Sequence, residues 1–168
     1  QNPKKALKVA TWMTVAETYM NAYDAPTGSV MTGATKQELQ FMMGNAKPSS
    51  SEEVVLAGQP FIKEVYADKN LYFNANGQLS IVEVTKPVYP NSLEKALAAY
   101  VKANEVDAKQ TKLKEINAGL EAIASRYLTE AFNSYQFGDF KKASEYFEKS
   151  ADAAATAPLS KLDTSAVY

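Results

Sequence analysis

The chain has 168 residues, 46% of them hydrophobic, a formal net charge of -1, and neither histidine nor cysteine. This length suffices for one domain core or a few stacked repeats, and the balanced charge gives no basic stripe for nucleic acid or an anionic membrane. The missing residue types exclude disulfides, the usual zinc and iron–sulfur sites, a Ser-His-Asp triad and a cysteine nucleophile. We therefore expect no cofactor, no metal and no enzymatic activity. No apolar run approaches a membrane span, so we also expect no membrane insertion.

Both ends of the chain have helical periodicity. Apolar side chains recur at three- and four-residue steps over residues 4–23, after a proline that suits a first helical turn. The same periodicity predicts helices over residues 91–110, over 111–137, and after the break at Gly138. Asn91 or Ser92 is the predicted cap of the first of these.

Residues 24–90 have a different character, with turn residues between short apolar runs. Thr35 and Glu38 have the spacing of a capping box and predict a short helix. A strand–turn–strand pattern covers residues 54–66. We therefore predict one short helix and one or two β-hairpins in this segment.

The clearest hairpin signal is Asn76-Gly77, which lies between apolar runs. Both residue types accept a positive φ, as a two-residue hairpin turn requires. We predict an antiparallel pair around Phe73 and Ile81, with a positive φ at Gly77.

Residues 124–157 resemble the tetratricopeptide repeat, a pair of antiparallel helices of about 34 residues. Ser134 and Ser150 depart from the family pattern. In such a repeat, small residues let the two helices approach, and large aromatic residues fill the gaps around them. The positions that match are Tyr127, Ala131, Gly138, Phe140, Ala143 and Phe147.

A second, interrupted repeat resembles the same family. Its helix A carries Trp12, Val15, Ala16 and Tyr19, and its helix B carries Ala96, Tyr100 and Ala103. Residues 24–90 then form an insertion, and the resemblance implies that 1–23 and 91–110 pack antiparallel with Ala16 near Ala96.

The resemblance implies a mainly α fold, a fragment of an α-solenoid of TPR-like antiparallel helix-pair repeats with a β-hairpin-containing insertion in the first repeat. Residues 111–157 are the second repeat, with an extended helix A, and 158–168 are the start of a further helix or a cap. Further repeats of the same chain then follow. Proteins interrupted in this way resemble exported proteins of Bacteroidetes-type bacteria, which implies an exported or periplasmic location.

The function implied by the resemblance is a protein–protein interaction scaffold that binds a peptide or protein partner on a concave helix-A surface. Each residue of that surface has an alternative role in the core or under a neighbouring helix. The family pattern, carried over to this chain, gives Met13, Glu17, Met20 and Asn21 in the first repeat and Leu128, Phe132, Tyr135 and Gln136 in the second.

Other patterns leave alternatives open. The hairpin region could form a small-ligand or glycan-binding module, and Met42-Met43 could either line an adaptable groove or simply pack. Glu52-Glu53, or Glu64 with Asp68, could be a glycosidase carboxylate pair, although neighbouring acids are more often solvated surface groups.

Overall fold

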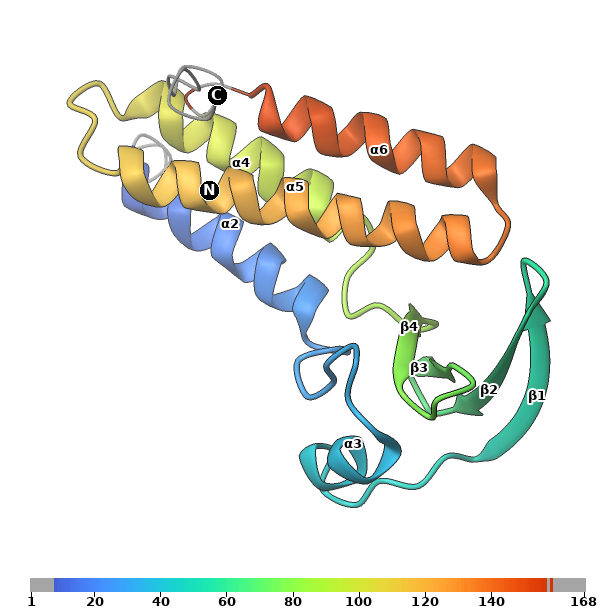
Figure 1. The fold of residues 1–168 in the computed structure, drawn as a ribbon. Helices are drawn as coiled ribbons and strands as arrows, with labels where there is room; N and C mark the ends of the chain where they lie inside the picture. The colour runs from blue at the N-terminus through green and yellow to red at the C-terminus, as the bar shows by residue number, and fades with distance from the viewer. Residues whose placement is uncertain (1–7, 157, 159–168) are drawn as a thin grey trace. The chain divides into compact units, whose positions relative to one another are not determined.

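The computed structural model describes residues 8–156 and 158, which contain five helices and four strands (Figure 1). The helices are α2 (Val9–Asp24), α3 (Lys36–Met42), α4 (Ser92–Val106), α5 (Leu113–Gln136) and α6 (Phe140–Ala154). The strands are β1 (Ser50–Leu56), β2 (Gln59–Val65), β3 (Lys69–Phe73) and β4 (Leu79–Val84).

The chain divides into two compact units. The helical unit contains residues 8–21, 91–131 and 144–156, and the sheet unit contains residues 22–90 and 132–143. The predicted segment at 158–168 lies outside the described residues except for Pro158. None of the described helices is long and apolar enough to cross a membrane.

This mixed α/β fold shows that the predicted mainly α solenoid was wrong. Of the described residues, 51% are helical and 18% are in strands, and these strands form one antiparallel sheet in the order β1-β2-β3-β4. One or two β-hairpins were predicted, and the structure has two, joined into one sheet because β2 also pairs with β3, with Ile62 opposite Phe73. The middle segment is therefore a folded unit with its own core. The sequence had predicted an insertion into a helical repeat instead.

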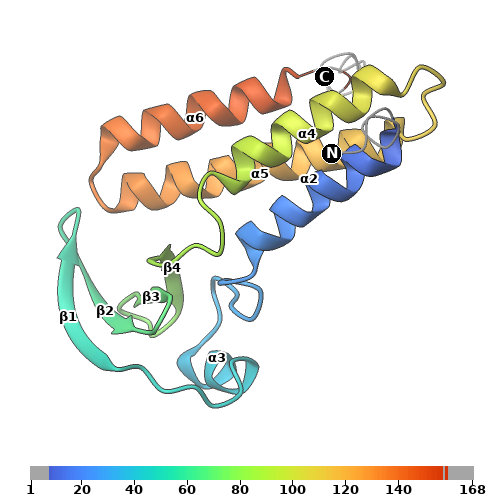
Figure 2. The same cartoon turned by 180° about the vertical axis from the view of Figure 1, so that it is seen from behind.

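The helical unit brings together helices that the insertion separates in sequence. In Figures 1 and 2, α2 and α4 run in opposite directions, as predicted. Ala16 and Ala96 are both fully buried. The Nζ of Lys95 lies 5.6 Å from the centre of the Tyr19 ring, so the two helices also touch through a cation–π contact.

Helices α4 and α5 approach each other closely at Gly119. A Cβ built on Gly119 of α5 would lie 2.1 Å from Cζ of Tyr100 on α4. Tyr100 is itself buried, so its ring has little room to move. The missing side chain of Gly119 therefore makes the space that the tyrosine ring occupies.

Asp107 organises the connection between α4 and α5. Its carboxylate accepts hydrogen bonds from the backbone N–H groups of Thr111 and Lys112, at 2.9 and 2.7 Å, and from the Thr111 hydroxyl at 2.8 Å. Burial opposes ionisation of Asp107, but these hydrogen bonds and the positive charge of Lys112 outweigh it and lower its pKa. At the start of α4, Asn91 makes no capping bond through its side chain. Its backbone is left-handed, with φ 56°, and a capping residue needs an extended backbone.

The sheet unit has a small apolar core between the sheet and α3. Its buried members are Ala34, Leu39, Leu71, Phe73 and Leu79. The predicted capping box at the start of α3 is present. The Thr35 side chain accepts from the Glu38 N–H, and the Glu38 carboxylate accepts from the Thr35 N–H at 2.7 Å.

The turn between β3 and β4 lies one residue earlier than predicted. The Asn74 carbonyl accepts from the Gly77 N–H at 2.9 Å, so Ala75 and Asn76 are the central residues of the turn. Gly77 follows with φ 74°, which confirms the predicted positive φ. Phe73 consequently faces Leu79, and Ile81 pairs with Tyr72.

We expect Gly119→Ala to destabilise the protein, although alanine is the better helix former. The new methyl group would collide with the buried Tyr100 ring, so the free energy of unfolding should fall by roughly 1–3 kcal/mol in a urea titration. Ala118→Gly, at the exposed neighbouring position, is the control and should cost about 1 kcal/mol through helix propensity alone. A higher urea midpoint for Gly119→Ala would contradict the close contact.

We expect the contribution of Asp107 to stability to depend on pH. Its pKa is lower in the folded chain than in the unfolded one, so the contribution is complete above about pH 4, the ordinary aspartate value. It is lost as the pH falls through the folded pKa. The stability difference between wild type and Asp107→Asn, from urea titrations at several pH values, should therefore shrink in acid. Thr111→Ala removes one donor and should weaken the dependence. A difference that stays constant from pH 7 to acid would refute this role.

Candidate functional site

Half of the first set of partner-binding residues predicted from the sequence is buried in the core of the helical unit. Met13 and Met20 are buried together with Ala16, because the three share one face of α2 at three- and four-residue spacing. Neither methionine is available to a partner. Glu17 and Asn21 are exposed.

The second set is more accessible. Leu128, Phe132 and Tyr135 on α5 are all exposed. Gln136 is half-buried, and its Oε1 accepts a hydrogen bond from the Ser80 hydroxyl at 3.1 Å. Gln136 therefore contributes to the sheet unit, while the aromatic residues remain on the surface.

A tight turn between α5 and α6 positions the aromatic side chains. Gly138 adopts φ 77°, and its N–H donates to the Tyr135 carbonyl at 2.9 Å. Asp139 then begins α6, since its carboxylate accepts from the Lys142 N–H at 3.0 Å and its carbonyl accepts from the Ala143 N–H at 2.9 Å. Both helix ends are thus closed by hydrogen bonds within a few residues.

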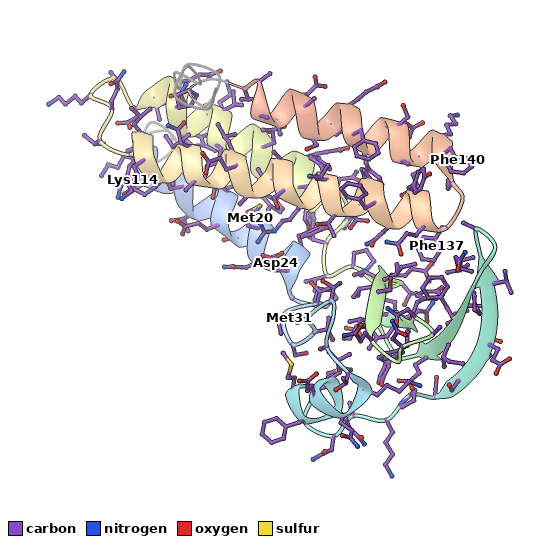
Figure 3. All side chains as sticks on the ribbon, viewed as in Figure 1. Met20, Asp24, Met31, Lys114, Phe137 and Phe140 are labelled. Carbon is purple, nitrogen blue, oxygen red and sulfur yellow. The ribbon has the colours of Figure 1, made fainter. Side chains whose placement is uncertain are left out.

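We call Phe132, Tyr135 and Phe140 the aromatic patch. The rings of Tyr135 and Phe140 meet edge to face, with centroids 5.3 Å apart and an interplanar angle of 65°. Even so, Phe132, Tyr135 and Phe140 are 52, 56 and 62% exposed. Figure 3 labels Phe140 at the start of α6. Large apolar side chains that contact one another and remain open to solvent are typical of interaction surfaces.

The opposite side of the same turn is held against the sheet. Phe137 packs edge to face on Tyr72 of β3, with ring centroids 5.2 Å apart. The Nδ2 of Asn133 donates to the Val82 carbonyl at 3.3 Å. Together with the bond from Ser80 to Gln136, these contacts restrain the turn, so the aromatic patch is presented on a supported element.

The two edges of the sheet differ. Along β4, the Leu79 carbonyl accepts from the Gly33 N–H at 2.7 Å, and the Leu79 N–H donates to the Ala34 carbonyl at 2.9 Å. Asn133 occupies the Val82 carbonyl further along the same strand. Within the described part of the chain, β1 pairs with β2 alone. The outer edge of β1 is therefore open.

A groove of about 570 Å³ lies on the sheet beside this open edge. It is bounded by the β1–β2 hairpin and by the turn that follows β3. Its walls are mainly apolar, with Lys36 and Glu53 as the charged members. The residues that form its floor and rim include Val55, Pro60, Ile62 and Phe73.

A second hollow, of about 510 Å³, lies beside α3. Met42 lines it together with Met31 and Phe41, whereas Met43 packs against the core of the sheet unit. The adjacent methionines Met42 and Met43 therefore have different roles, and Met42 alone faces the hollow.

Two of the acidic residues considered as catalytic pairs, Glu52 and Glu64, are held in separate structural interactions. Glu52 lies 3.2 Å from Lys63, and Glu64 lies 2.7 Å from Lys36. Glu64 also accepts from the Tyr66 hydroxyl at 3.0 Å. Burial, followed by this hydrogen bond, raises the pKa of Tyr66 to about 12. Glu64 thus serves as a structural acceptor between Lys36 and Tyr66.

Glu83 of β4 anchors another polar cluster. Its Oε2 accepts from the Tyr72 hydroxyl and from the Asn70 amide, both at 2.7 Å. Burial and the adjacent carboxylate raise the pKa of Tyr72 well above its ordinary value. This cluster keeps the Tyr72 ring in place beneath Phe137. Among the described residues, no group of three or more acidic side chains could hold a metal ion.

Sequence reasoning missed Phe140 as a surface residue, because the repeat pattern assigned it to helix packing. It also missed the groove residue Val55, and it considered Glu53 only as part of a carboxylate pair, because the exposure of both depends on which sheet edge is covered. The position of Phe140 directly after Gly138-Asp139 was the available signal, since a residue in the first turn of a helix has few neighbours to cover it. Comparison with family models, curated proteins and solved structures gives no match.

We expect Ala57→Asn to stabilise the β1–β2 hairpin that carries the open edge. Ala57 and Gly58 form its two-residue turn with φ values of 47° and 79°, and asparagine tolerates the left-handed conformation better than alanine. The gain should be roughly 0.5–1 kcal/mol in a denaturant titration. Ala57→Val, with a branched Cβ, should change stability in the opposite direction. If both variants unfolded at the wild-type midpoint, the turn would not have this conformation.

Proposed function

We propose that this chain is a non-catalytic protein-binding module, and that a partner protein packs against the aromatic patch. The observation that carries the proposal is the contact between Tyr135 and Phe140, whose rings meet at 5.3 Å while each remains more than half exposed. Aromatic side chains dominate the energetics of protein interfaces when a partner covers them. This patch offers that kind of anchor without needing to rearrange.

The support beneath the patch favours the same function. Ordering a flexible loop on binding reduces affinity, whereas residues on restrained helix ends avoid most of that loss. The turn that carries Tyr135 and Phe140 is restrained through Phe137 and Asn133 on its other side. A partner would therefore meet a preformed apolar surface.

A small-ligand or glycan-binding module in the strand region is the alternative, and the groove on the sheet is the observation that favours it. Its volume of about 570 Å³ falls within the range of small-molecule sites. However, Val55 at its rim is largely exposed, and Lys36 is already engaged by Glu64 at 2.7 Å. Few polar groups remain to orient a sugar, so the groove suits an apolar segment better.

We expect Tyr135→Ser combined with Phe140→Ser to abolish partner binding and to leave the fold intact. Both side chains are exposed, so thermal unfolding should change little. A photo-crosslinking phenylalanine at position 135 should capture a discrete partner in extracts of the source organism. The same group at Val88, an exposed apolar position elsewhere in the sheet unit, is the control.

The decisive comparison is between the crosslinked products. A partner that crosslinks from position 135 and not from 88, and that the double variant no longer retains on size-exclusion chromatography, supports the proposal. Identical products from both positions, or a complex that survives in the double variant, would show that the aromatic patch is not the binding surface.

A further inference from the structure

Besides the aromatic patch, the sheet unit has a second surface that could bind a partner, the open edge of β1. An edge strand presents unpaired N–H and C=O groups to solvent, and proteins usually cover such edges or interrupt them. Here β4 is covered by residues 33–35 and by Asn133, whereas β1 keeps a regular seven-residue pairing with β2 and nothing in the described chain on its outer side. The uncovered edge is thus long enough to pair with another strand.

The register shows which side chains flank that edge on the groove side. Glu53 lies opposite Ile62, and Ile62 lies opposite Phe73, so these residues share one face of the sheet. Val55, two positions after Glu53, lies on this face as well and is 72% exposed. A strand added beside β1 would therefore have one side chain next to Glu53 and another, two residues away, next to Val55 and the groove.

The charges at the edge indicate what the added strand should carry. Glu52, on the opposite face, is paired with Lys63, and Glu64 is paired with Lys36. Glu53 forms no ion pair or side-chain hydrogen bond within residues 8–156, although it lines the groove. A carboxylate beside an apolar groove is complementary to a lysine or arginine next to an apolar side chain.

The same charges argue against pairing between two copies of this chain. An antiparallel pair of β1 strands centred on Glu53 would place two glutamates directly opposite each other. Centring the pair on Glu52 would again oppose two carboxylates. Like charges directly across a strand pair are destabilising, so these two registers are disfavoured and a partner of different sequence avoids them.

We propose that the outer edge of β1 binds an extended segment of another protein by β-strand addition. The segment carries a basic residue and an apolar residue two positions apart. Its backbone pairs with β1, its apolar side chain enters the groove beside Val55, and its cation meets Glu53. Backbone pairing of this kind provides affinity, while the alternate side chains provide specificity. This surface is separate from the aromatic patch, and the inference does not rest on the proposed function.

Synthetic peptides test the proposal directly. The probes are a blocked six-residue threonine peptide with lysine and valine two positions apart, its order-reversed form, a form with glutamate for lysine, and a backbone N-methylated form. Binding is followed by amide chemical shifts of the isotope-labelled chain. We expect one of the two lysine peptides to shift resonances of β1 and the groove. The glutamate and N-methylated forms should bind at least roughly tenfold more weakly.

Variants of the chain make the assignment specific. Glu53→Lys should reverse the preference between the lysine and glutamate peptides, whereas Glu52→Gln, on the opposite face, should not. Tyr135→Ser with Phe140→Ser should bind the peptides as wild type does, so this result is independent of the aromatic patch. The proposal is overturned if millimolar peptide causes no shifts in β1. It is also overturned if N-methylation or Glu53→Lys has no effect, or if β1 instead mediates concentration-dependent dimers in sedimentation.

Discussion

The backbone pairing between residues 33–35 and the start of β4 determines how the sheet unit can be used. By occupying the Leu79 N–H and carbonyl, this segment closes one edge of the sheet and places α3 over one of its faces. Asn133 extends the closure along β4 and links it to the end of α5. The sheet therefore has one covered edge and one open edge, and the contact of Asn133 on the covered edge also supports the turn that carries the aromatic patch.

Most of the secondary structure could be predicted from local sequence signals, because each signal reports a local requirement. The capping box of α3, the left-handed Gly77 and the helix break at Gly138 are all present. The pairing of β2 with β3 could not be predicted, since it depends on contacts between hairpins that leave no local pattern. The tetratricopeptide resemblance was misleading for a related reason. Buried alanines such as Ala131 and Ala143 occur wherever helices approach closely, and they do not specify a repeating array.

The candidate site could be predicted only in part. Helical periodicity identifies which residues share a face, so Phe132 and Tyr135 could be singled out, but it does not reveal which face a neighbour covers. On α2 the selected face turned inward, and Met13 and Met20 are core residues. On α5 the matching positions stayed at the surface, while Gln136 turned toward the sheet through Ser80. Exposure depends on tertiary contacts, so the predicted residues of α2 are partly buried whereas the aromatic residues of α5 are exposed.

The division of the chain also has a consequence for the order of folding. All four strands pair with neighbours in sequence, so the sheet forms through short-range contacts and can assemble quickly. The helical unit, in contrast, must bring residues 8–21 together with residues 91–131 across the whole middle segment. Closing so long a loop costs entropy, although each doubling of its length adds only about 0.6 kcal/mol. A sheet that is already compact reduces the length of free chain to be closed, so its early formation would accelerate the docking of α2 on α4.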